Sequence, residues 1–485
     1  MTGQRIPIPP RTGSHDLSVS AALDAFMATD WAPTPLPADD RVPGYAGLPA
    51  RRAALCGGCP GERLVVPAGQ LAVRSNDCDY RFRPHSAYAW LTGLTGEEQA
   101  GHVLVVEPTG EAVLHLRPRS PRDGGSSEFY RDRRYGEFWV GRRPDLAEAE
   151  RLTGLRTVHL DDLGTLFTGA QPPTRVLAGV DPELDALTGR PAAGHRAGDD
   201  RLAAVLAELR LVKDEWEVGQ LQLAVDHTVT GFADVVRELP AALRHHRGER
   251  WLEGVFDRRA RAEGNGPGYE TIVASGAHAC VLHWIRNDGR LDPADLLLLD
   301  AGVETDTLYT ADVTRTLPLS GTFSSAQRDV YELVLAAQDA GIAALRPGAS
   351  FRDFHRAAMR VIAEGLADWG LLKVSAEEAL HPDSGLYRRY TLCSSGHMLG
   401  LDVHDCARAR AEAYLDGVLA PGQVLTVEPG LYLQPDDETL PPELRGIGVR
   451  IEDDLVITAD GARLMSSALP RTPDAVEEWM GGLLG

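Results

Sequence analysis

The stretch DLLLLDAGVETDTLYTADVTRTL, residues 295–317, holds two apolar runs around a polar turn at Glu304–Asp306. Asp300 ends the first run and Asp312 lies in the second. This pattern predicts a β-hairpin, and a hairpin centred near residue 306 makes the two aspartates cross-strand partners with Cβ atoms roughly 5 Å apart. Two carboxylates at that distance repel, so one takes a proton or a cation lies between them.

A second hairpin with related chemistry is predicted further along the chain. QVLTVEPGLYL, residues 423–433, places Glu428 at the end of an alternating strand. GIGVRIEDDLVIT, residues 446–458, places Glu452 in another strand, with Arg450 on the same face two residues earlier. Each of the two strand pairs therefore offers two acids.

The segment SSGHMLGLDVHDC, residues 394–406, supplies two histidines, His397 and His404. His397 together with the four acids gives one nitrogen and four formal negative charges, which two divalent cations would neutralise. Carboxylates and imidazole suit Mn²⁺, Co²⁺, Zn²⁺ or Fe²⁺ better than soft thiophilic ions. Paired metals about 3.5–4 Å apart are an established hydrolytic device, because they generate hydroxide and polarise a carbonyl.

The composition is that of a globular protein with more than one domain. The chain has 485 residues, of which 43% are hydrophobic and 25% charged, so two domains are the natural expectation. A net charge of −21 argues against a nucleic-acid partner, which requires clustered Lys and Arg. No signal-peptide core and no apolar run near the roughly 20 residues of a membrane span are found, so we expect a cytoplasmic protein.

Patterning along the chain suggests where the domains lie. Residues 1–45 are rich in Pro, Asp and Ala and are predicted to be an arm. Residues 46–195 alternate short apolar runs with polar turns and helical stretches, as an α/β domain does. Residues 196–475 begin with a helical period and then mix strands with helices. The Arg- and aromatic-rich segment 119–143 is either a solvated surface segment or a loop that reaches a neighbouring subunit.

Five of these motifs occur in the order found in a known family: LLLLDAG, ADVTRT, GHMLGLDVHD, TVEPGLY and GVRIEDD. In this respect the chain resembles the pita-bread metallopeptidases of the creatinase and prolidase type, and most closely the aminopeptidase P family. RSNDCDYRFRPHSAYAWLTGL, residues 74–94, resembles the creatinase-like N-terminal domain of that family, and VASGAHACVLHW, residues 273–284, resembles its strand before the metal site. The resemblance covers about residues 45–470.

The resemblance implies a two-domain α/β fold, with a creatinase-like N-terminal domain and a C-terminal pita-bread (α+β) metallopeptidase domain. It implies two divalent metal ions, usually Mn²⁺, and a homodimer or homotetramer. The implied enzyme is a metalloaminopeptidase, which releases an N-terminal residue that precedes proline through attack by a hydroxide that bridges both metals.

The resemblance also implies a role for each matching residue. The implied metal ligands are Asp300, Asp312, His397, Glu428 and Glu452, with Asp312 and Glu452 bridging both metals. Outside the ligand set, His404 would contact the scissile peptide, His283 would line the substrate site, Glu428 would relay protons and Arg450 would support the cluster. Asp405 directly follows His404 and is placed to help orient it.

One position departs from the family pattern. The family usually has a histidine four residues before the metal-binding one, and in CSSGH, residues 393–397, Cys393 stands there instead. A thiol is a weaker hydrogen-bond donor than an imidazole. Three interpretations follow: an Xaa-Pro aminopeptidase that tolerates the change, the same scaffold redirected to another reaction such as a prolidase-like dipeptidase, and a silent binding protein of the same fold.

Overall fold

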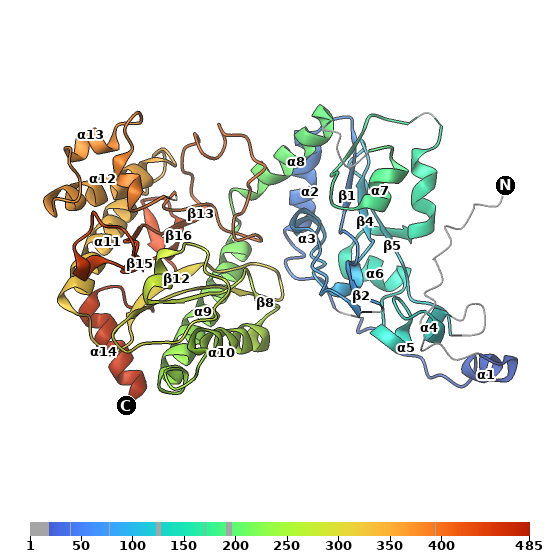
Figure 1. Ribbon diagram of the computed structural model, residues 1–485. Helices are drawn as coiled ribbons and strands as arrows, with labels where there is room; N and C mark the ends of the chain where they lie inside the picture. The colour runs from blue at the N-terminus through green and yellow to red at the C-terminus, as the bar shows by residue number, and fades with distance from the viewer. Residues whose placement is uncertain are drawn as a thin grey trace. The chain divides into compact units, whose positions relative to one another are not determined.

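The computed structural model describes residues 19–38, 40–76, 78–122, 128–169, 171–190, 196–392 and 394–485. The chain divides into two compact units, one that runs to Leu209 and one from Arg210 to Gly485 (Figure 1). Among the helices of the described residues, none has the length and apolar character needed to span a membrane.

The first unit is built on a five-stranded sheet of order β6-β5-β4-β1-β7. The strands are β1 (Arg63–Pro67), β4 (Val103–Val106), β5 (Ala112–Leu116), β6 (Arg156–His159) and β7 (Thr174–Val176). The pairs β1–β4 and β4–β5 are antiparallel, whereas β5–β6 and β1–β7 are parallel. The neighbouring interior strands β4 and β1 are buried along their whole length, which explains their continuous apolar sequences.

Short helices accompany this sheet, together with the small hairpin of β2 (Val73–Ser75) and β3 (Cys78–Asp79). The helices are α1 (Ala21–Met27), α2 (Leu48–Gly58), α3 (Ser86–Thr92), α4 (Glu128–Arg131), α5 (Glu137–Val140), α6 (Leu146–Thr153), α7 (Pro182–Leu187) and α8 (Ala197–Arg210). Helix α6 begins with a capping box formed by Asp145 and Glu148. Helices α4 and α5 fall within the segment 119–143, and its contact with a neighbouring subunit stays a prediction.

The second unit contains several small sheets. Their orders are β12-β10-β9, β13-β16-β17, β14-β15 and β11-β8. The strands are β8 (Gly266–Pro267), β9 (Ile272–Ser275), β10 (Leu296–Ala301), β11 (Val303–Glu304), β12 (Val313–Pro318), β13 (Val424–Val427), β14 (Gly430–Tyr432), β15 (Gly448–Arg450), β16 (Asp453–Ile457) and β17 (Ala462–Leu464).

Long helices pack against these sheets (Figure 1). They are α9 (Glu215–Ala242), α10 (Gly248–Glu263), α11 (Ser325–Ala344), α12 (Asp353–Asp368) and α14 (Pro473–Leu484). The short helix α13 (Ala376–Leu380) packs against α12. Helices α9, α10 and α14 share one apolar core with β10 and β12, and helices α11 and α12 share another with β14 and β15. The prediction of an α/β domain followed by a mixed α and β domain is confirmed.

The alternation of side chains along β10 and β12 determines on which face of the sheet the two aspartates lie. Leu297 and Leu299 of β10, with Val313 and Leu317 of β12, point into the core formed with α9 and α10. Because successive side chains of a strand point to opposite faces, the even-numbered residues point the other way. Asp300 is one of these, and it therefore lies on the face away from that core.

Candidate metal centre

The first acid pair comes from the hairpin of β10 and β12. Asp300 is paired with Thr314 rather than with Asp312, so the predicted cross-strand pairing is wrong. The turn is centred one residue later than predicted, because Thr305 N–H bonds to the Tyr309 carbonyl (2.9 Å) and Leu308 takes a left-handed φ of 68°. The resulting shift of two residues keeps both aspartates on one face, since the side-chain period of a strand is two.

Tyr269 lies between the two aspartates and bridges them. Its hydroxyl oxygen lies 2.7 Å from Asp300 Oδ1 and 2.6 Å from Asp312 Oδ1. A phenol has one hydrogen, so it donates to one carboxylate at a time. Sequence reasoning missed Tyr269, and no periodicity or spacing in the sequence links it to the two acids.

The second acid pair comes from the hairpins β13–β16 and β14–β15. Val427 opposes Asp453 and Gly430 opposes Arg450, so the two pairs share one register. Glu428 and Glu452 lie between the paired segments, at positions that this register places opposite each other.

Thr314 joins the two hairpins. Its hydroxyl donates to Glu452 Oε2 (2.6 Å), and its carbonyl accepts the Glu452 N–H (3.1 Å). Arg450 donates to the same hydroxyl oxygen through Nε (3.1 Å) and to Asp300 Oδ2 through a terminal nitrogen. Arg450 therefore lies against the acid cluster, and its positive charge is balanced by Asp300. The sequence predicted Arg450 on the same strand face as Glu452.

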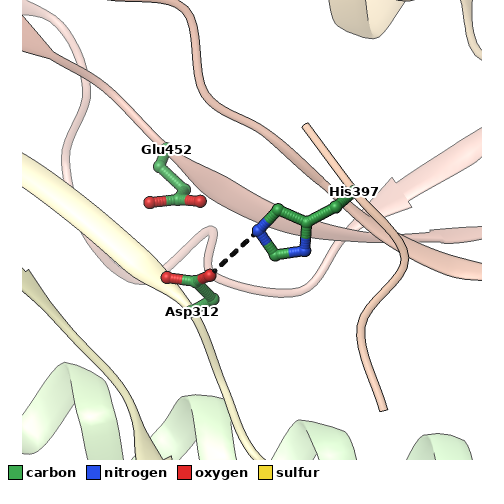
Figure 2. A group of neighbouring side chains, drawn as sticks. All are labelled: Asp312, His397 and Glu452. Carbon is green, nitrogen blue, oxygen red and sulfur yellow. Dashed lines mark ion pairs between the residues drawn. The ribbon is translucent and has the colours of Figure 1, made fainter. Parts of the chain in front are cut away.

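His397 completes the cluster from the loop before β13. Its Nε2 lies 3.3 Å from Asp312 Oδ2 and 3.5 Å from Glu428 Oε1. Its backbone N–H donates to Thr426 Oγ1 (3.1 Å), which fixes the loop against β13. Figure 2 shows Asp312, His397 and Glu452 converging from three separate segments, and ligand atoms of these three side chains lie within 4.8 Å of one another.

Burial and mutual repulsion oppose the charged forms of the acids. Burial, followed by the neighbouring acids, raises the pKa of Glu452 well above its usual range. Burial also raises the pKa of Glu428 to about 7, against the opposing effect of His397. Burial also raises the pKa of Asp300, against the opposing effect of Arg450. Burial would lower the pKa of His397, but Asp312 and Glu428 raise it to about 9. The cluster thus favours added positive charge.

The residues present fit divalent cations. Glu452 Oε1 is buried and has no hydrogen-bond partner among the described residues. A buried carboxylate oxygen without a partner is costly, and a cation would satisfy it. The donor set of carboxylate oxygens and one imidazole nitrogen is that of a hard or borderline divalent metal.

Asp454 is a second residue of this region that sequence reasoning missed. Its Oδ2 accepts the Asp312 N–H (3.0 Å), and its Oδ1 has no hydrogen-bond partner among the described residues. A signal was available, because Asp454 follows Glu452 by two residues and a strand places such residues on one face.

Two further histidines lie beside the cluster and are exposed. The ring of His404 meets that of His397 edge to face, with centroids 4.4 Å apart. Partial desolvation, and next the neighbouring His397, lower the pKa of the His404 ring. His283, which follows η3 (Gly276–Cys280), adds a smaller effect in the same direction. The structure therefore brings together the five predicted ligands, Arg450 and His404. His283 is linked to them only through its effect on His404, and Cys393 lies outside the described residues.

Comparison with known proteins agrees with this geometry. Residues 224–459 match the model of metallopeptidase family M24, and residues 49–171 match that of the aminopeptidase P N-terminal domain. Xaa-Pro aminopeptidase 1 of Streptomyces coelicolor is 53% identical over 482 residues, which cover 99% of this chain and 96% of that protein.

Solved structures give the same result. Pseudomonas aeruginosa aminopeptidase PepP superposes with a TM-score of 0.77 at 31% identity, over 91% of this chain and 99% of that one. Zn-substituted Escherichia coli aminopeptidase P in complex with product gives 0.76 at 30% identity, over 91% and 99%. The resemblance seen in the motifs is confirmed, and the chain belongs to the M24 metallopeptidases, within the aminopeptidase P family.

Proposed function

We propose that this metalloaminopeptidase releases the N-terminal residue of peptides whose second residue is proline. The observation that carries the proposal is the convergence of Asp312, His397 and Glu452 in a chain so similar to a Xaa-Pro aminopeptidase. Two divalent cations, held by Asp300, Asp312, His397, Glu428 and Glu452, would supply hydroxide at neutral pH and polarise the scissile carbonyl.

The side chains around the ligands keep the acids in place for this chemistry. Arg450 orients Asp300, and Thr314 orients Glu452. The Tyr269 hydroxyl lies within hydrogen-bond distance of both Asp300 and Asp312 and donates to one of them. Groups that fix metal ligands in this way raise both metal affinity and activity.

His404 is proposed to donate a hydrogen bond to the carbonyl oxygen before proline. The support for this role is that its ring is exposed to solvent and contacts the ring of His397 edge to face. The bond strengthens as negative charge develops on that oxygen, so it stabilises the transition state more than the substrate. His283 is proposed to line the substrate site beside it.

Glu428 is proposed to act as a proton relay as well as a metal ligand. Its Oε1 lies 3.5 Å from His397 Nε2, and its side chain is 15% exposed, whereas Glu452 is buried. It takes a proton from the attacking water and passes it to the proline nitrogen as the peptide bond breaks. Without that proton the leaving nitrogen would depart as an unstable anion.

The proposal is tested by mass spectrometry of a short Xaa-Pro peptide incubated with metal-loaded protein. We expect release of the first residue, no release after treatment with a chelator, and no release from the same peptide with an acetylated N-terminus. Cleavage of the acetylated peptide, or equal cleavage after chelation, would contradict the proposal.

Cys393 provides a prediction of its own. The unmodified protein is expected to release the N-terminal residue, and Cys393→His is expected to raise kcat by up to about 10², because an imidazole donates a stronger hydrogen bond than a thiol. Steady-state turnover of one Xaa-Pro peptide by both proteins measures this. Activity in the variant alone would mean that the scaffold serves another reaction.

The proposal also includes finer features. Mn²⁺ as the native metal agrees with the carboxylate-rich ligand set, although Co²⁺, Zn²⁺ and Fe²⁺ use the same donors. We keep a homodimer or homotetramer as the assembly, the cytoplasm as the location and no nucleic-acid partner. We also keep domain limits of 46–195 and 196–475; the chain does divide into two compact units, with the division between Leu209 and Arg210.

A further inference from the structure

A buried ion cluster lies next to His404 in sequence. The ammonium of Lys213 is 3.1 Å from Asp405 Oδ2, and the guanidinium of Arg210 is 3.2 Å from Asp405 Oδ1. The side chains of Lys213 and Asp405 are each 1% exposed. Such a pair is costly to desolvate and contributes little to stability, so a role in positioning the neighbouring His404 is considered.

The chain around Asp405 is folded closely about its carboxylate. The Asp405 N–H donates to the Met398 carbonyl (2.9 Å), which closes the loop that runs from His397. Cys406 donates its S–H to Asp405 Oδ2 (3.2 Å) and takes a left-handed φ of 60°. A Cβ on Gly400 would lie 2.2 Å from the same oxygen, so only glycine fits there.

Lys213 also contacts the other segment that leads into the cluster. Its backbone N–H donates to the carbonyl of Gly422 (2.8 Å), just before β13, and β13 ends next to Glu428. One residue thus bonds through its side chain to the His404 loop and through its backbone to the strand of Glu428.

The charges of the ion cluster keep it intact. Burial raises the pKa of Asp405, but Arg210 and Lys213 oppose this and the net shift is downward. Burial lowers the pKa of Lys213, but the opposing effect of Asp405 is larger, so the net shift of that pKa is upward. Lys213 is one of only two lysines in a chain that otherwise uses arginine, and a compact ammonium suits the small space beside Gly400.

We propose that Lys213 is a positioning residue for the peptidase reaction: its ammonium, with Arg210, fixes Asp405 and thereby the position of His404. The inference rests on the proposed function, because it deepens the role of His404. Lys213 touches no reacting atom and acts only through the loop.

A double-mutant cycle tests the inference. Lys213→Met, which removes the charge and keeps an unbranched side chain, is expected to lower kcat on a Xaa-Pro peptide about 10–100-fold with little change in KM. In a His404→Ala background the same substitution is expected to change kcat less than about twofold, because Lys213 affects the reaction only through His404, which is already removed. Asp405→Asn is expected to lower kcat in the same way, and it replaces Lys213→Met in the cycle if Lys213→Met folds poorly.

A matched control separates positioning from stability. Arg190 is paired with Asp199 at 2.7 Å and is similarly buried, but it lies in the first unit. Arg190→Met is expected to lower stability and leave kcat unchanged. Multiplicative, independent effects of Lys213→Met and His404→Ala would overturn the inference.

Hydrogen exchange gives a readout that does not need activity. Lys213→Met is expected to raise amide exchange in residues 398–406 at least about tenfold, whereas Arg190→Met leaves that segment unchanged. Unchanged exchange in this segment would overturn the inference. If the unmodified protein releases no residue from any Xaa-Pro peptide, the proposed function fails, and the exchange result alone decides the role of Lys213.

Discussion

Asp312→Asn is expected to reduce turnover of a Xaa-Pro peptide at least about 10³-fold and to lower the metal content of the purified protein. Asp312 is buried, contacts His397 and shares Tyr269 with Asp300, so it lies at the centre of the proposed ligand set. An amide there removes one negative charge and one oxygen ligand. Metal catalysis contributes several kcal/mol, and each 1.36 kcal/mol corresponds to a factor of ten in rate.

The control for this variant is Asp306→Asn, in the exposed turn of the same hairpin. It makes the same chemical change six residues away and is expected to retain both metal and activity. If Asp312→Asn keeps its metal and its turnover, the cluster is not the catalytic centre.

Glu428→Gln is expected to lower kcat about 10²–10⁴-fold, the range by which a general acid–base group accelerates a reaction. The amide oxygen can still reach a metal, but the side chain can no longer carry a proton. Metal content is therefore expected to fall less than in Asp312→Asn. Kinetics together with metal analysis by mass spectrometry distinguishes the two variants.

Glu438→Gln, at an exposed position after β14, is the matched control and should leave kcat unchanged. A Glu428→Gln protein that loses metal in parallel with activity would show that Glu428 is a ligand only. One that keeps full activity would remove it from the reaction altogether.

Much of this site could be predicted from the sequence because its acids lie in or next to strands. The period of two in a strand fixes the face of a side chain even when the register is misjudged. The pairing of Asp300 with Asp312 is wrong by two residues, yet both still point away from the core of Leu297 and Leu299. Only the turn at Thr305–Tyr309, with its left-handed Leu308, reveals the true register.

The remaining contacts could not be predicted because they join distant parts of the chain. Lys213 meets Asp405 across 192 residues, and Tyr269 reaches Asp312 across 43. No local periodicity reports such a contact, and a tyrosine or lysine outside a motif has no distinguishing pattern. Motif order pointed to the residues proposed for the site, whereas contacts between distant segments are visible only in the structure.

The most direct test of the account is a titration of metal-stripped protein with Mn²⁺, followed by release of the N-terminal residue from a Xaa-Pro peptide. A two-cation centre predicts no turnover without metal and activity that saturates near two equivalents of Mn²⁺ per chain. Turnover without metal, or none at any ratio of Mn²⁺ to protein, would contradict a two-cation peptidase centre built from these five side chains.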